Sequence, residues 1–400
     1  MDTDKALYPR YAGESIPLFW LALKTSLLTL ITLGIYRFWA KTRVRNYFWS
    51  SVVGEGDGFE YTGTGIEKLV GFLVAVVVLA IYLGIIQAIL YFAGLRLLQE
   101  TDFSVVFLLT LPLIFFAQYR ARRYRLARTR WRGLRFGVES AAWGYMFRAC
   151  WHLFLVVITL GILLPRQTFF LEKFVTDRSW YGNAKFEQTG KWTALFPAAI
   201  HVFIGGAIIL CGSVLLGIGG ASMLEVGPED FIPPLAVYAV LVLIVGCGWL
   251  MIGAAVYRIR SFAYLASNKV LDGHIRFTAQ PETGTLIMKA IFGNLMVGFA
   301  IGIPALLAIS LISAIFAPIV VGTGEGSLVL TLLFVVMILG IFALAGALRL
   351  IWVAQPIVAH LVQSVVIRNA EALDAIRQRT ADAGADAEGF ADALDVGGGI

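Results

Sequence analysis

Long apolar runs alternate with short basic segments along most of this chain. Several of the runs exceed the ~18 residues that let a helix cross the hydrocarbon core of a bilayer. They lack the alternation of apolar and polar residues that marks the strands of a membrane β-barrel. Because only helices and closed barrels satisfy their own backbone polar groups in lipid, this pattern predicts an all-α polytopic membrane protein.

The apolar runs predict about 7–8 hydrophobic helices within a multi-pass membrane domain over residues 16–364. The runs cover residues 18–40, 66–98, 103–118, 143–164, 193–220, 232–257, 285–316 and 328–362. A polar tail, residues 1–15, precedes them without a recognisable signal peptide. A cytoplasmic tail, residues 365–400, follows them. We expect it to be helical over 365–380 and disordered beyond, where it becomes acidic and rich in glycine.

Four units rich in basic and aromatic residues separate the apolar runs, at residues 37–65, 120–140, 166–191 and 258–284. In each unit an aromatic residue follows basic residues, and a second aromatic closes a short apolar, charged, aromatic run. The four pairs are Tyr47 and Tyr61, Tyr124 and Phe136, Phe174 and Phe186, and Tyr264 and Phe277. Their similar spacing predicts a repeated module, an amphipathic interfacial helix followed by a β-hairpin. The alternative for any single unit is a loop that only sets topology.

Two further similarities support an internal repeat. A glycine precedes each short run, at Gly58, Gly133, Gly182 and Gly273. The sequence Thr-Leu-Gly-Ile occurs at residues 32–35 and again at residues 159–162.

Charge predicts the orientation of the chain. The acidic loops at 99–102, 222–231 and 322–327 contain no Lys or Arg, whereas eight arginines lie between Arg120 and Arg135. The positive-inside rule therefore places all four units and the C-terminus in the cytoplasm. The segment 143–164 then cannot cross the membrane once, because basic units lie at both of its ends. We expect it to re-enter or to lie in the interface. The similar segment 18–40 either behaves alike or spans.

Composition narrows the function classes. The chain is 59% hydrophobic and 14% charged, with a mean hydropathy of +0.80 and a net charge of +6. In a membrane protein such a charge indicates anionic lipid headgroups as partners and no nucleic acid. The three cysteines lie in apolar segments without metal-ligand spacing, so we expect neither a metal nor a cofactor. The HExxH, CxxC, P-loop and GxSxG motifs are absent, which indicates that the protein is not an enzyme.

The basic residues are the candidates for a functional site, because the apolar segments contain no Asp or Glu apart from Glu67. We take the following residues as the candidate site for an anion or an acidic lipid headgroup: Lys24, Arg43, Arg45, Arg122, Arg123, Arg148, His152 and Lys289. The alternative is that most of them extend to lipid phosphates near the segment ends. Gly63 and Gly65 open a helix that could bind an anion, but Glu67 already occupies its first turn, which favours a purely structural elbow.

One stretch is specific enough to suggest a family. The run TLGIYRFWAKTRVRNYFW at residues 32–49, followed by GDGFEYTGTG at 56–65 and a membrane helix, resembles the YjgN/DUF898 family of bacterial inner-membrane proteins. The later units depart from it, because they lack the Thr-Gly-Thr-Gly elbow. The resemblance implies a polytopic inner-membrane protein and defines no catalytic residues.

Two functions remain open at this point. The first is transport or handling of an anionic or lipid substrate, which a continuous polar cavity lined by Lys24, Arg148 and His152 would favour. The alternative is a non-catalytic scaffold or partner of another membrane protein, which a solidly packed bundle with exposed amphipathic helices would favour.

Overall fold

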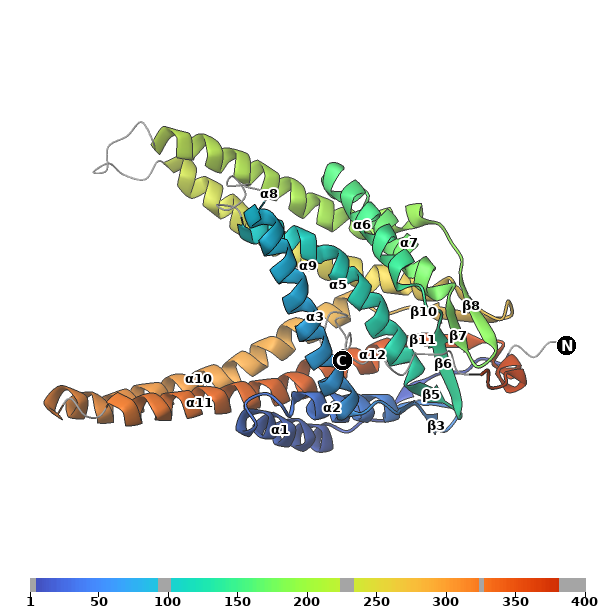
Figure 1. Cartoon of the computed structure of the whole chain (residues 1–400), viewed down its shortest axis with the longest axis horizontal. Coiled ribbons are helices and arrows are strands. Elements are labelled where there is room, and N and C mark those ends of the chain that lie inside the picture. Colours follow the sequence, from blue (N-terminus) through green and yellow to red (C-terminus); the bar gives the residue numbers. More distant parts are fainter. Residues whose placement is uncertain (1–4, 93–101, 224–233, 324–326, 381–400) are drawn as a thin grey trace.

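The computed structural model of the chain describes residues 5–92, 102–223, 234–323 and 327–380. Long helices extend from one end of the molecule, and short strands gather at the other end (Figure 1). The helices and strands therefore form two regions, and the chain passes between them many times.

The helices of the described part follow one another in pairs. The pairs are α1 (Ser15–Ile31) with α2 (Arg37–Ser50), α3 (Gly65–Phe92) with α5 (Asp102–Ala127), α6 (Ala142–Ile158) with α7 (Leu164–Thr176), α8 (Phe196–Met223) with α9 (Pro234–Ser267), and α10 (Thr283–Thr323) with α11 (Ser327–Arg349) and α12 (Gln355–Gln363). Short turns, η1 (Trp192–Leu195) and η2 (Leu350–Ala354), extend two of them.

Strands stand between the helical pairs. They are β1 (Arg10–Tyr11), β2 (Val52–Gly54), β3 (Asp57–Gly58), β4 (Glu60–Tyr61), β5 (Thr129–Trp131), β6 (Leu134–Val138), β7 (Ser179–Tyr181), β8 (Ala184–Gln188), β9 (Lys269–Leu271), β10 (Ile275–Ala279) and β11 (Val365–Arg368). An eight-stranded antiparallel sheet holds β4 to β11 in sequence order, and a three-stranded sheet holds β1 to β3.

The two sheets join into a closed ring. Phe59 alone separates β3 from β4, so one continuous segment pairs with β2 at its start and with β5 at its end. At the opposite junction, Leu7 and Ile367 exchange two backbone hydrogen bonds of 2.8 and 3.0 Å. Within the part of the chain that the structure describes, the ring therefore leaves no strand edge free along which another chain could pair.

The ring forces all helical pairs to one side. Successive antiparallel strands reverse direction, so alternate connections leave from opposite rims. Tight turns with positive φ form one set, as at Glu55-Gly56 (52° and 93°) and Arg132-Gly133 (52° and 76°). The helical pairs form the other set. In the first unit Gly56, and not Gly58, is the turn glycine.

Apolar side chains from every unit fill the ring. Trp131, Tyr181, Leu271 and Ile275 are buried there, and the Phe59 ring stacks on Trp131 at 5.5 Å. Short strands of alternating apolar and charged residues are unstable in isolation, and the ring lets each unit bury its apolar face against the others.

Three sequence-based expectations need correction. An all-α fold is too narrow a description, because the hairpins assemble into a sheet. The predicted helix over 365–380 is wrong: these residues form β11 and a short 3₁₀ helix, η3 (Ala370–Ala375). Val365, Val366 and Ile367 are β-branched, which suits pairing with β10. The predicted disorder after residue 380 concerns residues outside the described part.

The third correction concerns the apolar segments 18–40 and 143–164. Neither of them is a single helix. Each breaks at the repeated Thr-Leu-Gly-Ile sequence, where Leu33 and Leu160 both have φ of 49°. The following Gly34 and Gly161 have φ of 92° and 91°. Each segment is therefore a helix, a left-handed turn and the start of a second helix.

Among the described residues, five helical stretches are long and apolar enough to cross a membrane. They are Gly65–Ile89, Trp192–Gly219, Leu235–Ser267, Thr283–Ile315 and Leu332–Gln363. Ser15–Ile31 and Ala142–Ile158 are apolar but shorter.

Candidate functional site

A chamber of about 510 Å³ lies where α2, α5 and α12 reach the helix-side rim of the ring. Most of its lining is apolar or aromatic: Phe48, Trp49, Val52, Phe59, Arg125, Leu126, Thr129, Phe136 and Val358. The indole N–H of Trp49 donates to the Thr129 hydroxyl at 2.9 Å, and this bond fixes one wall. That hydroxyl donates in turn to the Arg125 carbonyl at 2.8 Å.

A smaller cavity of about 130 Å³ adjoins the chamber, because Leu126 and Phe136 line both. Its other lining residues come from α5, α7 and the strands: Arg122, Thr176, Ser179, Trp180, Phe186 and Lys269. Together the two spaces have an apolar end at α2 and α12 and a cationic end at α7 and β9.

An ion cluster forms the cationic end. The Arg122 guanidinium makes two hydrogen bonds, of 2.7 and 2.9 Å, to the Glu172 carboxylate. The Lys269 ammonium donates to the same carboxylate at 2.6 Å. Burial alone would raise the pKa of Glu172, but the charges of Arg122 and Lys269 outweigh it and hold that pKa well below its usual range. The cluster therefore sets one carboxylate against two basic side chains, a formal net charge of +1.

A second polar cluster lies where α3 begins. Arg45 is fully buried and donates to the Tyr61 hydroxyl at 3.0 Å. Glu67 accepts hydrogen bonds from the Arg128 guanidinium at 2.6 Å and from the Tyr124 hydroxyl at 2.8 Å. These bonds tie α2 to β4 and the C-terminal end of α5 to the first turn of α3.

The Thr-Gly-Thr-Gly elbow beside it has a structural explanation. Thr64 and Glu67 hydrogen-bond reciprocally across the first turn of α3, as in a capping box. A Cβ atom at Gly65 would lie 2.7 Å from the Trp39 ring. The helix N-terminus is thus occupied by Glu67, and the geometry agrees with the elbow interpretation rather than with an anion site.

The eight candidate residues do not form one site. Arg122 belongs to the ion cluster and Arg45 to the α3 cluster, while Arg123 donates to the Val138 carbonyl at 3.0 Å. The other five lie elsewhere: Lys24 on α1, Arg43 on α2, Arg148 and His152 on α6, and Lys289 on α10.

Arg148 and His152 pack against aromatic rings of α7. The Arg148 guanidinium lies 4.7 Å from the centre of the Phe174 ring, and His152 stacks on Phe170 at 5.6 Å. Neither of them, nor Lys24, lines the chamber or the adjoining cavity.

Sequence reasoning missed Glu172, Lys269 and the aromatic wall. Each lies in or beside a predicted hairpin unit, so the units were the correct place to search. Glu172 and Lys269 are 97 residues apart, and no local pattern pairs them.

These features define a polytopic membrane protein whose helical pairs are mounted on a closed ring of strands. The chain belongs to the family described as "Bacterial protein of unknown function (DUF898)", whose model matches residues 7–393. A curated relative, the inner membrane protein YjgN of Salmonella typhimurium, is 27% identical over 154 residues, 38% of this chain. The match covers 36% of that relative's length. No solved structure matches the chain.

The relative and the apolar helices together support a location in the bacterial inner membrane. Among the described residues, no group of three or more His, Cys, Asp or Glu side chains is placed to hold a metal ion.

Proposed function

We propose that this protein binds an anionic amphiphile, a molecule with an acyl chain and an acidic end, in the chamber at the rim of the ring. The observation that carries the proposal is an apolar space of about 510 Å³ that shares Leu126 and Phe136 with a smaller cavity lined by Arg122 and Lys269 of the cationic cluster. The volume falls within the ~300–1,000 Å³ of typical ligand pockets. Val358, one of the lining residues, also belongs to the apolar stretch Leu332–Gln363, and the membrane is where such molecules are concentrated.

The energetics favour this class of ligand. Each methylene group of an acyl chain buried among Phe48, Phe59 and Phe136 contributes about 0.8 kcal/mol. The acidic end meets the surplus positive charge of the Arg122, Glu172 and Lys269 cluster. Because that cluster is already hydrogen-bonded, it is held in place before a ligand arrives, which reduces the ordering cost of binding.

The same proposal includes an orientation. The ring lies in the cytoplasm, because its outer face carries basic residues such as Arg130, Arg135 and Arg276. The C-terminus lies on that side too. The five apolar stretches of α3, α8, α9, α10 and α11 cross the membrane, and in this proposal α5 is a sixth crossing helix, because it brings the chain back from α3 to the ring. The basic units are copies of one module, each supplying one hairpin to the ring.

Native mass spectrometry tests the chamber directly. The protein is released from nanodiscs that contain equal amounts of phosphatidylethanolamine and phosphatidylglycerol, and the retained lipids are counted. Val358→Trp fills the chamber and should lower lipid retention about tenfold, which corresponds to ~1.4 kcal/mol. The control is Val335→Trp, which adds the same ring at an exposed position on α11. Equal retention by all three proteins contradicts the proposal.

A second experiment measures which lipid headgroup the protein prefers. Lys269→Gln removes the surplus charge while leaving the Arg122 and Glu172 pair intact, so it should weaken the preference for phosphatidylglycerol over phosphatidylcholine. Lys185→Gln, on an exposed strand position, should not. Retention of added oleate in place of phospholipid would identify a free fatty acid as the ligand. A stoichiometric protein partner with no retained lipid would instead favour the scaffold alternative.

A further inference from the structure

The pairs α1/α2 and α6/α7 differ from the others, because they are too short to cross and return. α1 and α6 have 17 residues each, and α7 has 13. At 1.5 Å per residue, 17 residues reach about 25 Å, which is less than the ~30 Å hydrocarbon core.

Strand pairing fixes both ends of each short pair at the same rim. β1 precedes α1 and pairs directly with β2, which follows α2, with Tyr11 opposite Val52. β6 precedes α6 and pairs directly with β7, which follows α7, with Phe136 opposite Tyr181. A helical pair whose two ends are joined by a strand pairing must leave and return on one side of the membrane.

The far end of each short pair is apolar and exposed. Leu33 and Leu160, at the two turns, are 94% and 83% exposed. Ile31 and Ile158 precede these turns and are exposed as well. Exposed apolar groups of this kind at the end of a helical pair are typical of a surface that contacts lipid.

The turns also satisfy their own backbone groups, which entry into lipid requires. The Gly34 N–H donates to the Thr29 carbonyl at 2.7 Å, and the Gly161 N–H donates to the Val156 carbonyl at 2.8 Å. The Thr32 hydroxyl donates to the Leu28 carbonyl at 2.8 Å and accepts from the Tyr36 N–H at 2.9 Å. Thr159 makes the corresponding two bonds in the second turn.

Neighbouring elements show where the short pairs lie. α1 packs along α11, and α6 packs along α5. The start of α1 stays at the rim, because the Ser15 hydroxyl donates to Gln355 at 3.0 Å. Both short pairs lie on the helix side of the strands (Figure 1). Their turns therefore lie beside the spans, within the half of the bilayer nearest the ring.

From these observations we infer that α1/α2 and α6/α7 are re-entrant hairpins, with Leu33 and Leu160 in the acyl region of the leaflet nearest the ring. Lys24, Arg37, Arg148 and Arg166 lie along the same helices and extend to the phosphates of that leaflet. The inference is independent of the chamber and of any ligand in it.

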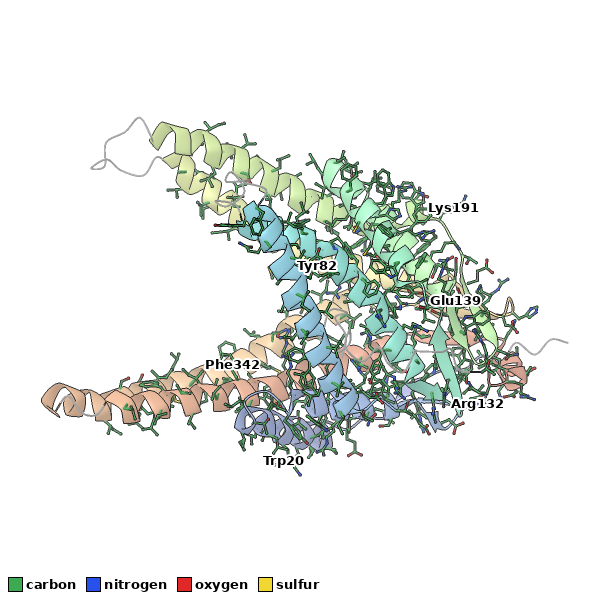
Figure 2. The ribbon with its side chains drawn as sticks, in the orientation of Figure 1. Trp20, Tyr82, Arg132, Glu139, Lys191 and Phe342 are labelled. Carbon is green, nitrogen blue, oxygen red and sulfur yellow. The ribbon has the colours of Figure 1, made fainter. Side chains whose placement is uncertain are left out.

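Single-cysteine variants test it in a background without Cys150, Cys211 and Cys247. Leu33→Cys and Leu160→Cys carry a nitroxide label, and the relaxation of each label by oxygen and by a water-soluble nickel complex reports its depth. Phe342→Cys, on the exposed surface of α11, is the lipid control, and Arg132→Cys, at a strand turn, is the aqueous control. Figure 2 shows Phe342 in the helical part of the molecule and Arg132 among the strands.

The expected result is oxygen-dominated relaxation at both turns, as at position 342. Neither turn cysteine should react with an impermeant maleimide added outside sealed cells. Reaction of Leu160→Cys from outside would overturn the inference in favour of a crossing segment. Relaxation dominated by the nickel complex at both turns, as at position 132, would overturn it in favour of helices that lie in water.

Discussion

At the residue scale, Glu172 determines whether the cationic end of the chamber is stable. Its carboxylate is the common acceptor for Arg122 and Lys269, and its side chain is only 20% exposed. Removing one partner of a buried ion pair is costly because the other charges lose their compensation. The remaining two cations would then repel each other in a poorly solvated space.

The first prediction concerns the stability of a variant without the Glu172 carboxylate. Glu172→Gln should lower the free energy of unfolding by at most about 3–5 kcal/mol, the cost for a fully buried ion pair, because this cluster is only partly buried. Glu187→Gln, at an exposed strand position, should change it little. Thermal unfolding in detergent, followed by tryptophan fluorescence, measures both. Equal stability of the two variants would show that the cluster is solvated and not needed to hold α7 to the ring.

The second prediction concerns pH. The pKa of Glu172 is depressed in the folded protein, whereas an unfolded glutamate titrates near ~4.3. A depressed acid pKa adds stability that is present above the unfolded value and is lost as pH falls through the folded value. The stability difference between the wild type and Glu172→Gln should thus be constant from pH 7 to about pH 5 and shrink below ~4.3. Unfolding temperatures across this range check it. A difference that persists at low pH would assign the effect to packing rather than to charge.

Of the three residues of the ion cluster, sequence reasoning identified Arg122 alone. Arg122 stood among the candidates because charge inside an apolar protein is conspicuous. Lys24 and Arg43 stood there for the same reason, although they are exposed on α1 and α2. Arg122 differs from these two because the Glu172 carboxylate reaches it from α7, and Lys269 of β9 binds that same carboxylate. Such partners depend on the assembled ring, which no single segment encodes.

At the element scale, the helices differ in how closely they pack. α8 and α9 approach each other at glycines: a Cβ atom at Gly253 would lie 2.8 Å from the His201 backbone, and one at Gly205 would lie 2.8 Å from the Leu250 backbone. Small residues allow this close contact between membrane helices, where van der Waals packing replaces the hydrophobic effect.

The third prediction uses two glycines of α9. Gly253→Val should destabilise the protein by about 1–3 kcal/mol, because the new side chain meets the α8 backbone. Gly248→Val, five residues away on the same helix, meets nothing within 4 Å and is the matched control. Unfolding temperature and resistance to protease in detergent report the difference. Equal effects from both substitutions would mean that α8 and α9 do not pack through these glycines.

Element prediction from sequence succeeded where length and apolarity decide the outcome. The stretches beginning at Gly65, Trp192 and Thr283 follow from apolar length alone. It failed at Leu33 and Leu160, because Thr and Leu are compatible with a helix and the left-handed turn depends on the glycine that follows each leucine. It also failed at Val365–Arg368, whose strand forms because β10 is there to pair with it.

At the scale of the whole molecule, the closed ring of strands could not be predicted from the sequence. The four hairpins were predicted one by one, each as a cover for its own helix. In the structure each hairpin pairs with the next, and the N-terminal segment closes the series against β11. These pairings join residues up to hundreds of positions apart, so local patterns carry no trace of them.

The last prediction tests ring closure and topology together. Leu7 and Ile367 exchange both backbone hydrogen bonds, and in such an antiparallel pair the two Cα atoms lie about 5.5 Å apart. That separation suits a disulfide. In a background without the native cysteines, Leu7→Cys with Ile367→Cys should therefore cross-link on oxidation and shift the mobility of the denatured protein on a gel.

The matched control moves one partner along the same strand. Leu7→Cys with Val365→Cys displaces the second sulfur by two residues, about 6.6 Å, which exceeds what a disulfide can bridge. If α1 crossed the membrane instead of returning to the rim, residue 7 would lie on the opposite side from residue 367 and neither pair would cross-link. A cross-link in the first pair alone would place the N-terminal segment beside β11 on one side of the membrane, as closure of the ring requires.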